Sequence, residues 1–288
     1  MVRVRSSSLM PMLVVAIVVA VLYVPLMVAA NYGPAKRALE RGAVLDCPSA
    51  FACSFQLRSP VIPAPGQLIR GVQNLSWPPL SPTAIPYNAA FTAMETLVGL
   101  LLASLVGLFF AVGLVASRPF EKSLLPWLVA SQTIPIIAIA PMLAVLLGQY
   151  GVQGWVPKAI IAAYIAFFPI TIGVAKGLRS PEPLALDLMK TYNSTDLQTY
   201  AKLRFPASLP YLFTAFKVSM AAALIGSIIG EISTISFQGL GRMLSENSRA
   251  SDVVALWVIM LASSLLGIFL VALVGWIEKV VSPWRLGR

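Results

Sequence analysis

Few residues of this sequence have the types and spacing that covalent chemistry requires. The 288 residues include no histidine and only two cysteines, so zinc-hydrolase signatures, histidine-based triads and cysteine-rich metal sites cannot be written. The nucleotide-binding pattern G-x-x-x-x-G-K-[ST] does not occur in the sequence either. We therefore expect no catalytic residue, no metal site and no cofactor in this chain. Any ATP that drives it would be bound by another subunit.

The remaining functional candidates lie within long apolar runs. Glu95 and Glu231 stand near the ends of two such runs, and a carboxylate in a membrane is a functional candidate. The alternative is that each one reaches the polar interface. Pro135 would bend a helix and free backbone carbonyls, as in helices that line transport sites. Ser131 and Gln132, just before this break, could bond either a polar solute or another helix. These five residues are the candidates for a translocation path.

The composition places these runs in lipid. Hydrophobic residues make up 58% of the chain, charged residues 11%, and the mean hydropathy is +0.83, whereas soluble domains are about 45 to 50% apolar and about 25% charged. A membrane-spanning helix needs roughly 20 apolar residues. Six runs qualify, at residues 9–30, 87–116, 124–148, 156–176, 211–234 and 253–278. We predict an all-α polytopic membrane protein with six transmembrane helices.

The first run divides the chain and has a second interpretation. Its basic start and its Val-Ala-Ala end also resemble a secretory signal peptide, but the run is longer than the roughly 7 to 15 residues of a signal-peptide core. We therefore expect a retained N-terminal transmembrane helix within residues 1–30. An external loop would follow over residues 31–86, and a core domain over 87–284 would contain a cytoplasmic loop at 177–210.

Lysine and arginine counts predict the orientation. With the N-terminus inside, the inner segments carry 12 of these residues in 55 positions and the outer segments carry 8 in 90. We therefore expect a multi-pass protein of the cell (inner) membrane with both termini in the cytoplasm. The net charge of +10 agrees with this sorting and with anionic lipid headgroups, so no nucleic-acid partner is required. Cys47 and Cys53 would lie outside, where a disulfide is possible and two free thiols are the alternative.

Two other patterns concern helix packing and the outer surface. Gly226 and Gly230 form a G-x-x-x-G pattern, which allows close helix approach either within one subunit or across a dimer. The segment PAPGQLIRGVQNL has apolar residues on one helical face, which predicts a short helix at the membrane surface.

A polar insert at residues 184–210 interrupts the apolar runs. Leu184 and Leu188 fall at helical spacing and predict a short helix with an apolar stripe. Asn193 would end this helix, because asparagine tolerates the left-handed conformation found at helix C-termini. Such a helix is suited to docking in the groove of a partner, and an ordinary connecting loop is the alternative.

A second short helix is predicted directly after Asn193. Thr195 and Gln198 have the spacing of a capping box, in which each side chain bonds the backbone N–H of the other residue. We expect Pro206 and Pro210 to end this second helix and to begin the next membrane span.

The insert resembles a cytoplasmic motif of the inner-membrane permeases of ATP-binding-cassette (ABC) importers. That motif reads E-A-A, three residues, G, nine residues, I-x-L-P. Its spacing is kept here, with Leu-Met in place of Ala-Ala and Asn in place of Gly. The resemblance implies that this loop is a coupling helix that contacts an ATPase. The positions carried over are Asp187, Leu188, Met189, Asn193, Leu203 and Pro206.

Further segments, over roughly residues 58–284, resemble the nitrate, sulfonate, taurine and thiamine-precursor branch of these importers. They are SPVIPAPGQLIRGV, ETLVGLLLASLVGLFFAVGLVASRPFEKSLLP, ASQTIPIIAIAPML, FFPITIGVAKGLRS and QGLGRMLSENSRASD. The resemblance implies a type I importer permease fold and a substrate-binding protein that docks outside, with Gly239, Gly241 and Arg242 as docking candidates. It also implies a second permease subunit, identical or homologous, and two ATPase subunits that bind ATP and Mg. A pyrimidine-like heterocycle is the first choice of substrate, and a small anion such as sulfonate or nitrate is the second.

Two other classes of protein would fit a chain of this composition. An ion-coupled secondary transporter would need coupling carboxylates near the midplane of the membrane, whereas the acids found here lie near the ends of their runs. A membrane scaffold that transports nothing would not need the span that proline interrupts. Both features favour the importer permease.

Overall fold

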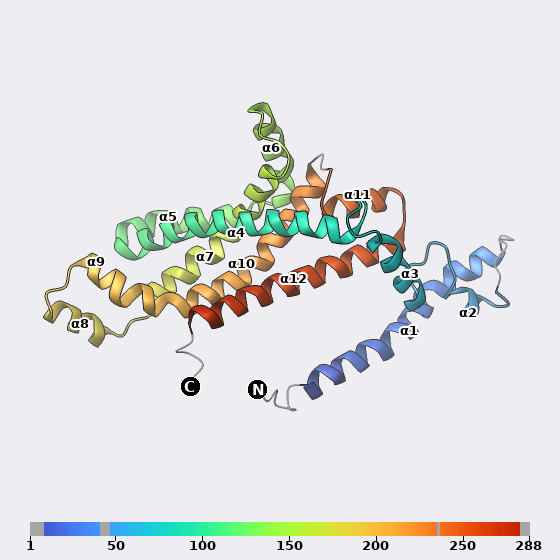
Figure 1. The fold of residues 1–288 in the computed structure, drawn as a ribbon, viewed down its shortest axis with the longest axis horizontal. Helices are drawn as coiled ribbons and strands as arrows, with labels where there is room; N and C mark the ends of the chain where they lie inside the picture. The colour runs from blue at the N-terminus through green and yellow to red at the C-terminus, as the bar shows by residue number, and fades with distance from the viewer. Residues whose placement is uncertain (1–8, 41–46, 235–236, 283–288) are drawn as a thin grey trace. The chain divides into compact units, whose positions relative to one another are not determined.

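Residues 9–40, 47–234 and 237–282 are described by the computed structural model, and this part of the chain contains helices and no strand (Figure 1). The all-α prediction is therefore confirmed. The helices are α1 (Leu9–Glu40), α2 (Ala50–Cys53), α3 (Pro65–Ser76), α4 (Ile85–Ala116), α5 (Arg118–Thr133), α6 (Ile136–Gln149), α7 (Val156–Leu178), α8 (Pro183–Thr191), α9 (Asp196–Thr199), α10 (Phe205–Ser233), α11 (Leu240–Arg249) and α12 (Val253–Val281).

The predicted count of six membrane spans is not confirmed. In the described part of the chain, four helical stretches are long and apolar enough to cross a membrane, namely α4, α7, α12 and the stretch that ends with α10. The count rises to five if α5 and α6, which meet at 95°, form one broken span. α1 is a helix and extends to Glu40, beyond the predicted end at residue 30.

Contacts within the chain group it into two units. One comprises residues up to Pro78 together with Leu244–Leu261, and the other comprises Pro79–Met243 together with the segment from Ala262 onward. The predicted domain boundaries at residues 30 and 86 stay predictions. The predicted cytoplasmic location of the two chain ends concerns residues 1–8 and 283–288, which lie outside the described residues.

In the first unit, the buried Asn31 side chain holds the segment that follows α2 against α1. Its Nδ2 donates to the carbonyl of Ile62 at 2.8 Å, and its Oδ1 accepts from the backbone N–H of Val61 at 2.8 Å. A disulfide between Cys47 and Cys53 closes the segment that contains α2, with the two Cα atoms 5.3 Å apart. Asn31 thus holds the chain after α2, and the disulfide joins the chain before α2 to its last residue.

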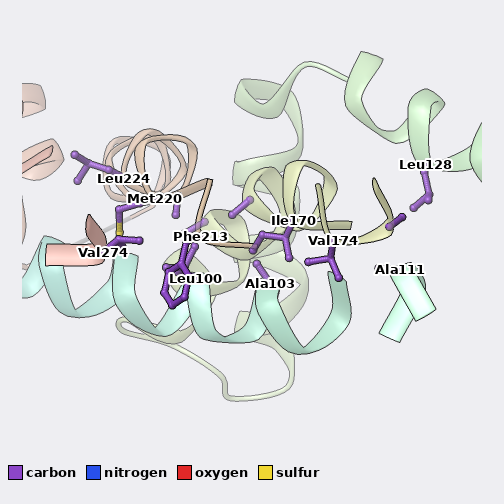
Figure 2. Close-up of a cluster of buried hydrophobic side chains, with 14 of the residues drawn as sticks. Leu100, Ala103, Ala111, Leu128, Ile170, Val174, Phe213, Met220, Leu224 and Val274 are labelled. Atoms are coloured by element: carbon purple, nitrogen blue, oxygen red, sulfur yellow. The ribbon is translucent and has the colours of Figure 1, made fainter. Parts of the chain in front are cut away.

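In the second unit, α7 packs against both α4 and α10. Figure 2 shows the apolar side chains where these helices meet. Gly226 brings α10 close to α7, because a Cβ at this position would lie 2.8 Å from the Cα of Ala162. Gly230 approaches Lys158 of α7 in the same way. The G-x-x-x-G pattern therefore serves packing within one subunit, one of the two uses that the sequence left open. The buried residues labelled in the figure include Leu100, Ala103, Ile170, Val174, Phe213, Met220, Leu224 and Val274.

The prediction that Pro206 and Pro210 separate two helices is wrong. Residues Asp196–Ser233 form one continuous helical stretch of 38 residues, in which Tyr200–Arg204 is a π-helical turn. The N–H of Phe205 bonds to the carbonyl of Tyr200, five residues earlier. Proline interrupts the usual bonding to the carbonyl four residues earlier. The wider π-helical turn replaces that bonding just before Pro206, so the helix continues.

Candidate functional site

The turn between α8 and α9 has the predicted left-handed geometry. Asn193 has a φ of 50°, its N–H donates to the carbonyl of Lys190 at 2.8 Å, and the N–H of Ser194 donates to the carbonyl of Met189 at 3.1 Å. These two bonds are the pair that defines a Schellman motif at a helix C-terminus. Asn193 therefore replaces the family's glycine without losing the conformation that a glycine would adopt.

The predicted capping box at the start of α9 is also present. The Thr195 N–H donates to Gln198 Oε1 at 3.0 Å, and the Gln198 N–H donates to Thr195 Oγ1 at 3.3 Å. Two backbone N–H groups that a helix start leaves unpaired are thereby satisfied. The two helices of the loop are thus ended and started by local hydrogen bonds.

α8 presents an apolar face that the described part of the chain leaves uncovered. Leu184 is 78% exposed, Leu188 55% and Tyr192 76%, and their spacing of four residues places them on one side of the helix. Asp187 pairs with Lys190 at 2.9 Å beside this face. Of the other positions carried over from the family motif, Met189 and Leu203 are half-buried and Pro206 is exposed.

At the break between α5 and α6, a neighbouring helix supplies the hydrogen-bond donor that proline lacks. In an unbroken helix the N–H of residue 135 would bond to the carbonyl of Ser131, but Pro135 has none. The hydroxyl of Tyr164, on α7, donates to that carbonyl instead. The Ser131 hydroxyl donates to the carbonyl of Leu128 at 2.7 Å, and Gln132 is exposed. The Gln132 amide lies within 3.4 Å of the Ser131 hydroxyl.

The removal of the Tyr164 hydroxyl is expected to loosen this break. In Tyr164→Phe the carbonyl of Ser131 loses its donor, at a cost of about 0.6 to 1 kcal/mol. Spin labels on α5 and α6 should then show a broader distance distribution than in the parent protein. Thr214→Val, which removes an intrahelical hydroxyl bond to Pro210, is the matched control and should leave that distribution unchanged. Equal broadening in both variants would contradict the role given to Tyr164.

A second polar cluster holds the loop that precedes α11. Three consecutive backbone N–H groups, those of residues 239–241, each donate to a buried side chain. The acceptors are Asn88 Oδ1 at 2.8 Å, Thr92 Oγ1 at 2.9 Å and Glu231 Oε2 at 2.5 Å. Thr92 Oγ1 also donates to Glu231 Oε1 at 2.7 Å. The start of α11 is therefore bound to α4 and α10 by side chains rather than by its own residues.

The predicted residues Glu95 and Glu231 both lie in this cluster. Each is 1% exposed, so both carboxylates are buried within the chain. Glu95 Oε1 pairs with Lys158 Nζ at 3.1 Å, and this pair is buried as well. Partners of this kind are what make a buried charge tolerable.

Two of the three docking candidates, Gly239 and Gly241, lie directly against Glu231. Gly239 has a φ of 113°, and a Cβ there would overlap the Glu231 carboxylate. A Cβ at Gly241 would lie 2.5 Å from the carbonyl oxygen of Ile228 and 2.8 Å from the Cβ of Glu231. Glycine is therefore required where the loop meets Glu231. The third candidate, Arg242, donates from its Nη2 to the carbonyl of Pro82 at 3.3 Å.

Sequence reasoning did not identify Asn88, Thr92, Lys158 or Tyr164. A signal for the first two was present, because Asn88, Thr92 and Glu95 follow one another at helical spacing within an apolar run. No local pattern indicates Lys158 or Tyr164, since each acts on a residue of another helix.

The described helices have a fold that is similar to chains of solved ABC transporters. The solved structure of the methionine ABC transporter MetNI, in inward-facing conformations, matches with a TM-score of 0.54 at 16% identity, over 75% of this chain and 95% of that one. An amino acid ABC transporter matches with a TM-score of 0.50 at 15% identity, over 74% of this chain and 94% of the other. These likenesses concern the fold.

The chain belongs to the family of binding-protein-dependent transport system inner membrane components, whose model matches residues 76–285. The formylaminopyrimidine transport permease protein ThiX of Halalkalibacterium halodurans is 30% identical over 225 residues, which cover 78% of this chain and 86% of that protein. A probable ABC transporter permease protein of Haemophilus influenzae is 39% identical over 159 residues, 55% of this chain and 63% of its own length. The putative aliphatic sulfonates transport permease protein SsuC of Bacillus subtilis is 24% identical over 188 residues, 65% of this chain and 66% of SsuC.

Proposed function

We propose that this chain is the membrane-spanning permease subunit of an ABC importer that brings a small solute into the cell. The observation that carries the proposal is the uncovered apolar face of α8, formed by Leu184, Leu188 and Tyr192, on a chain of the permease family. An apolar face on a short helix fits the groove of a partner protein. The partner proposed is the ATPase subunit of the importer.

The orientation and partners of the complex follow from this assignment. The loop with α8 and α9 would face the cytoplasm, together with both chain ends, and α11 would face outward. Two ATPase subunits would bind ATP and Mg, and this chain would do no covalent chemistry. A second permease subunit, identical or homologous, would complete the path, and a substrate-binding protein would deliver the solute at α11.

The route of coupling can be traced through this chain's own residues. Closure of the ATPase subunits would displace α8, and the turn at Asn193 joins α8 to the helical stretch that contains α10. At the other end of this stretch, Glu231 holds the loop before α11. Docking of a binding protein at α11 would therefore act on the same helix that the ATPase moves. Gln132, at the break between α5 and α6, is the proposed polar contact of the solute on its path.

The proposed substrate is a pyrimidine-like heterocycle, with a small anion as the second choice. Support for the first comes from the relative named for formylaminopyrimidine transport, and support for the second from the relative named for aliphatic sulfonates. A thermal-shift screen of the cognate binding protein against both compound classes would decide between them.

ATPase activity of the assembled complex tests the function. We expect the loaded binding protein to stimulate ATP hydrolysis by the complex, and Leu188→Asp to abolish that stimulation, because a carboxylate would replace the apolar centre of the α8 face. Lys190→Ser, one half-turn away on the same helix, is the control and should keep most of the stimulation. A chain that co-purifies with no ATPase, or an unaffected Leu188→Asp complex, would refute the proposal. Uptake driven by an ion gradient alone would support a secondary transporter instead.

A further inference from the structure

A cavity of about 500 Å³ opens in the second unit, at the end of the helices from which the α8–α9 loop departs. Its walls come from the last turns of α4 and α7, the first turns of α5, and α10. The apolar part of its lining includes Leu114, Leu125 and Ile172. The polar part includes the exposed Lys176 and Arg179, which form a rim. The cavity therefore combines an apolar wall with a cationic rim.

The charge at the rim comes from Lys176. Arg179 is paired with Glu121 through two bonds, at 2.8 and 2.7 Å, so these two charges balance. No hydrogen bond or ion pair joins the exposed Lys176 ammonium to any residue that the structure describes. One positive charge is left at the mouth of the cavity.

Hydrogen-bond donors surround that charge. Arg179 donates a third N–H to the carbonyl of Leu114 at 2.8 Å. A guanidinium has five N–H groups, so two remain available as donors. Tyr211, on α10, lines the same cavity, and so does Ser180, whose hydroxyl donates to the carbonyl of Ala207 at 3.4 Å. The rim thus offers a cation and several donors but one acidic group, Glu121, which its arginine already neutralises.

We propose that this cavity binds an anionic phospholipid, with the phosphate at Lys176 and the start of an acyl chain against the apolar wall. Basic pockets between transmembrane helices on the cytoplasmic side bind the headgroups of anionic lipids. The assignment of this side to the cytoplasm rests on the proposed function, whereas the chemistry of the cavity does not depend on it. Free phosphate would satisfy the rim equally well but would leave the apolar wall uncovered.

Lipid retention by the full chain in nanodiscs tests this site without any transport assay. The chain is reconstituted with an equimolar mixture of phosphatidylglycerol and phosphatidylcholine, extracted, and the retained lipid is measured by native mass spectrometry. We expect phosphatidylglycerol to be retained preferentially, and Lys176→Gln to lower its retention about fivefold, the factor for the loss of one cation near an anionic headgroup. Lys122→Gln removes an exposed cation that does not line the cavity and should leave retention unchanged.

Three outcomes would overturn the site. The first is equal retention of the two lipids, and the second is an equal loss of phosphatidylglycerol in both lysine variants. The third is displacement of phosphatidylglycerol by excess inorganic phosphate, which would indicate that the ligand is a soluble anion. Lys176→Gln must keep the parent's elution volume and unfolding temperature, and Lys176→Arg should restore retention if charge alone is required. A complex that shows this lipid preference but no stimulated ATPase would refute the proposed function and leave the lipid site standing.

Discussion

Glu231→Leu should release the loop before α11 and uncouple the complex from its binding protein. The substitution leaves the N–H of Gly241 without its buried acceptor and removes the bond from the Thr92 hydroxyl to Glu231, at a cost of about 2 kcal/mol. Amide hydrogen exchange of a peptide covering residues 237–249 should accelerate about 30-fold, since each 1.4 kcal/mol is a factor of ten. Stimulation of the ATPase by the loaded binding protein should be lost.

The control for this prediction is the conservative variant at the same position. Glu231→Gln keeps one acceptor for the Gly241 N–H, so the loop should exchange more slowly than in Glu231→Leu. Exchange in the α8–α9 peptide should be the same in both variants, because the lost bonds lie at the other end of α10. If the 237–249 peptide exchanges at the parent rate in Glu231→Leu, then Glu231 does not anchor the loop.

Gly226→Leu should destabilise the second unit more than a substitution at any exposed position does. A side chain at this position would enter the backbone of α7, where the carbonyl oxygen of Ile161 lies 3.1 Å from the position of a Cβ. The two helices would have to separate, and overpacking of this kind costs about 3 kcal/mol or more when backbone must move. We expect a lower unfolding temperature in detergent and a smaller monodisperse fraction on size-exclusion chromatography.

Gly148→Leu is the matched control for the packing prediction. Gly148 is also helical, on α6, but a Cβ there would meet nothing within 4 Å. The same change should therefore leave the unfolding temperature near that of the parent. If both variants lower the unfolding temperature equally, then the loss of stability in Gly226→Leu does not come from the contact between α7 and α10.

Local patterns in the sequence predicted the features whose causes are local. The turn at Asn193, the capping box of Thr195 and Gln198, and the helix over residues 65–76 each depend on neighbours within a few positions, and each is present. The break at Pro135 was predicted for the same reason. The role of α8 as a contact for an ATPase stays a prediction.

Features that depend on contacts between distant residues were not predicted, or were predicted incorrectly. The sequence could not indicate that Tyr164 would supply a donor 33 positions from Ser131, or that Lys158 would pair with Glu95. Proline was expected to end a helix at Pro206, but the π-helical turn before it allowed the helix to continue. Periodicity shows which residues share a face and leaves open which helix that face meets.

The unbroken stretch from Asp196 to Ser233 has a mechanical consequence. Between Asp196 and Glu231 it is a helical rod about 50 Å long, at about 1.5 Å per residue, with a π-helical turn at Tyr200–Arg204. One end of the rod carries the turn to α8 and the other end carries the carboxylate that binds the loop before α11. Under the proposed function, a displacement of α8 would be carried along this one helical stretch to the loop before α11. The turn at Asn193 and the loop before α11 are thereby linked through a single helical stretch that contains a π-helical turn.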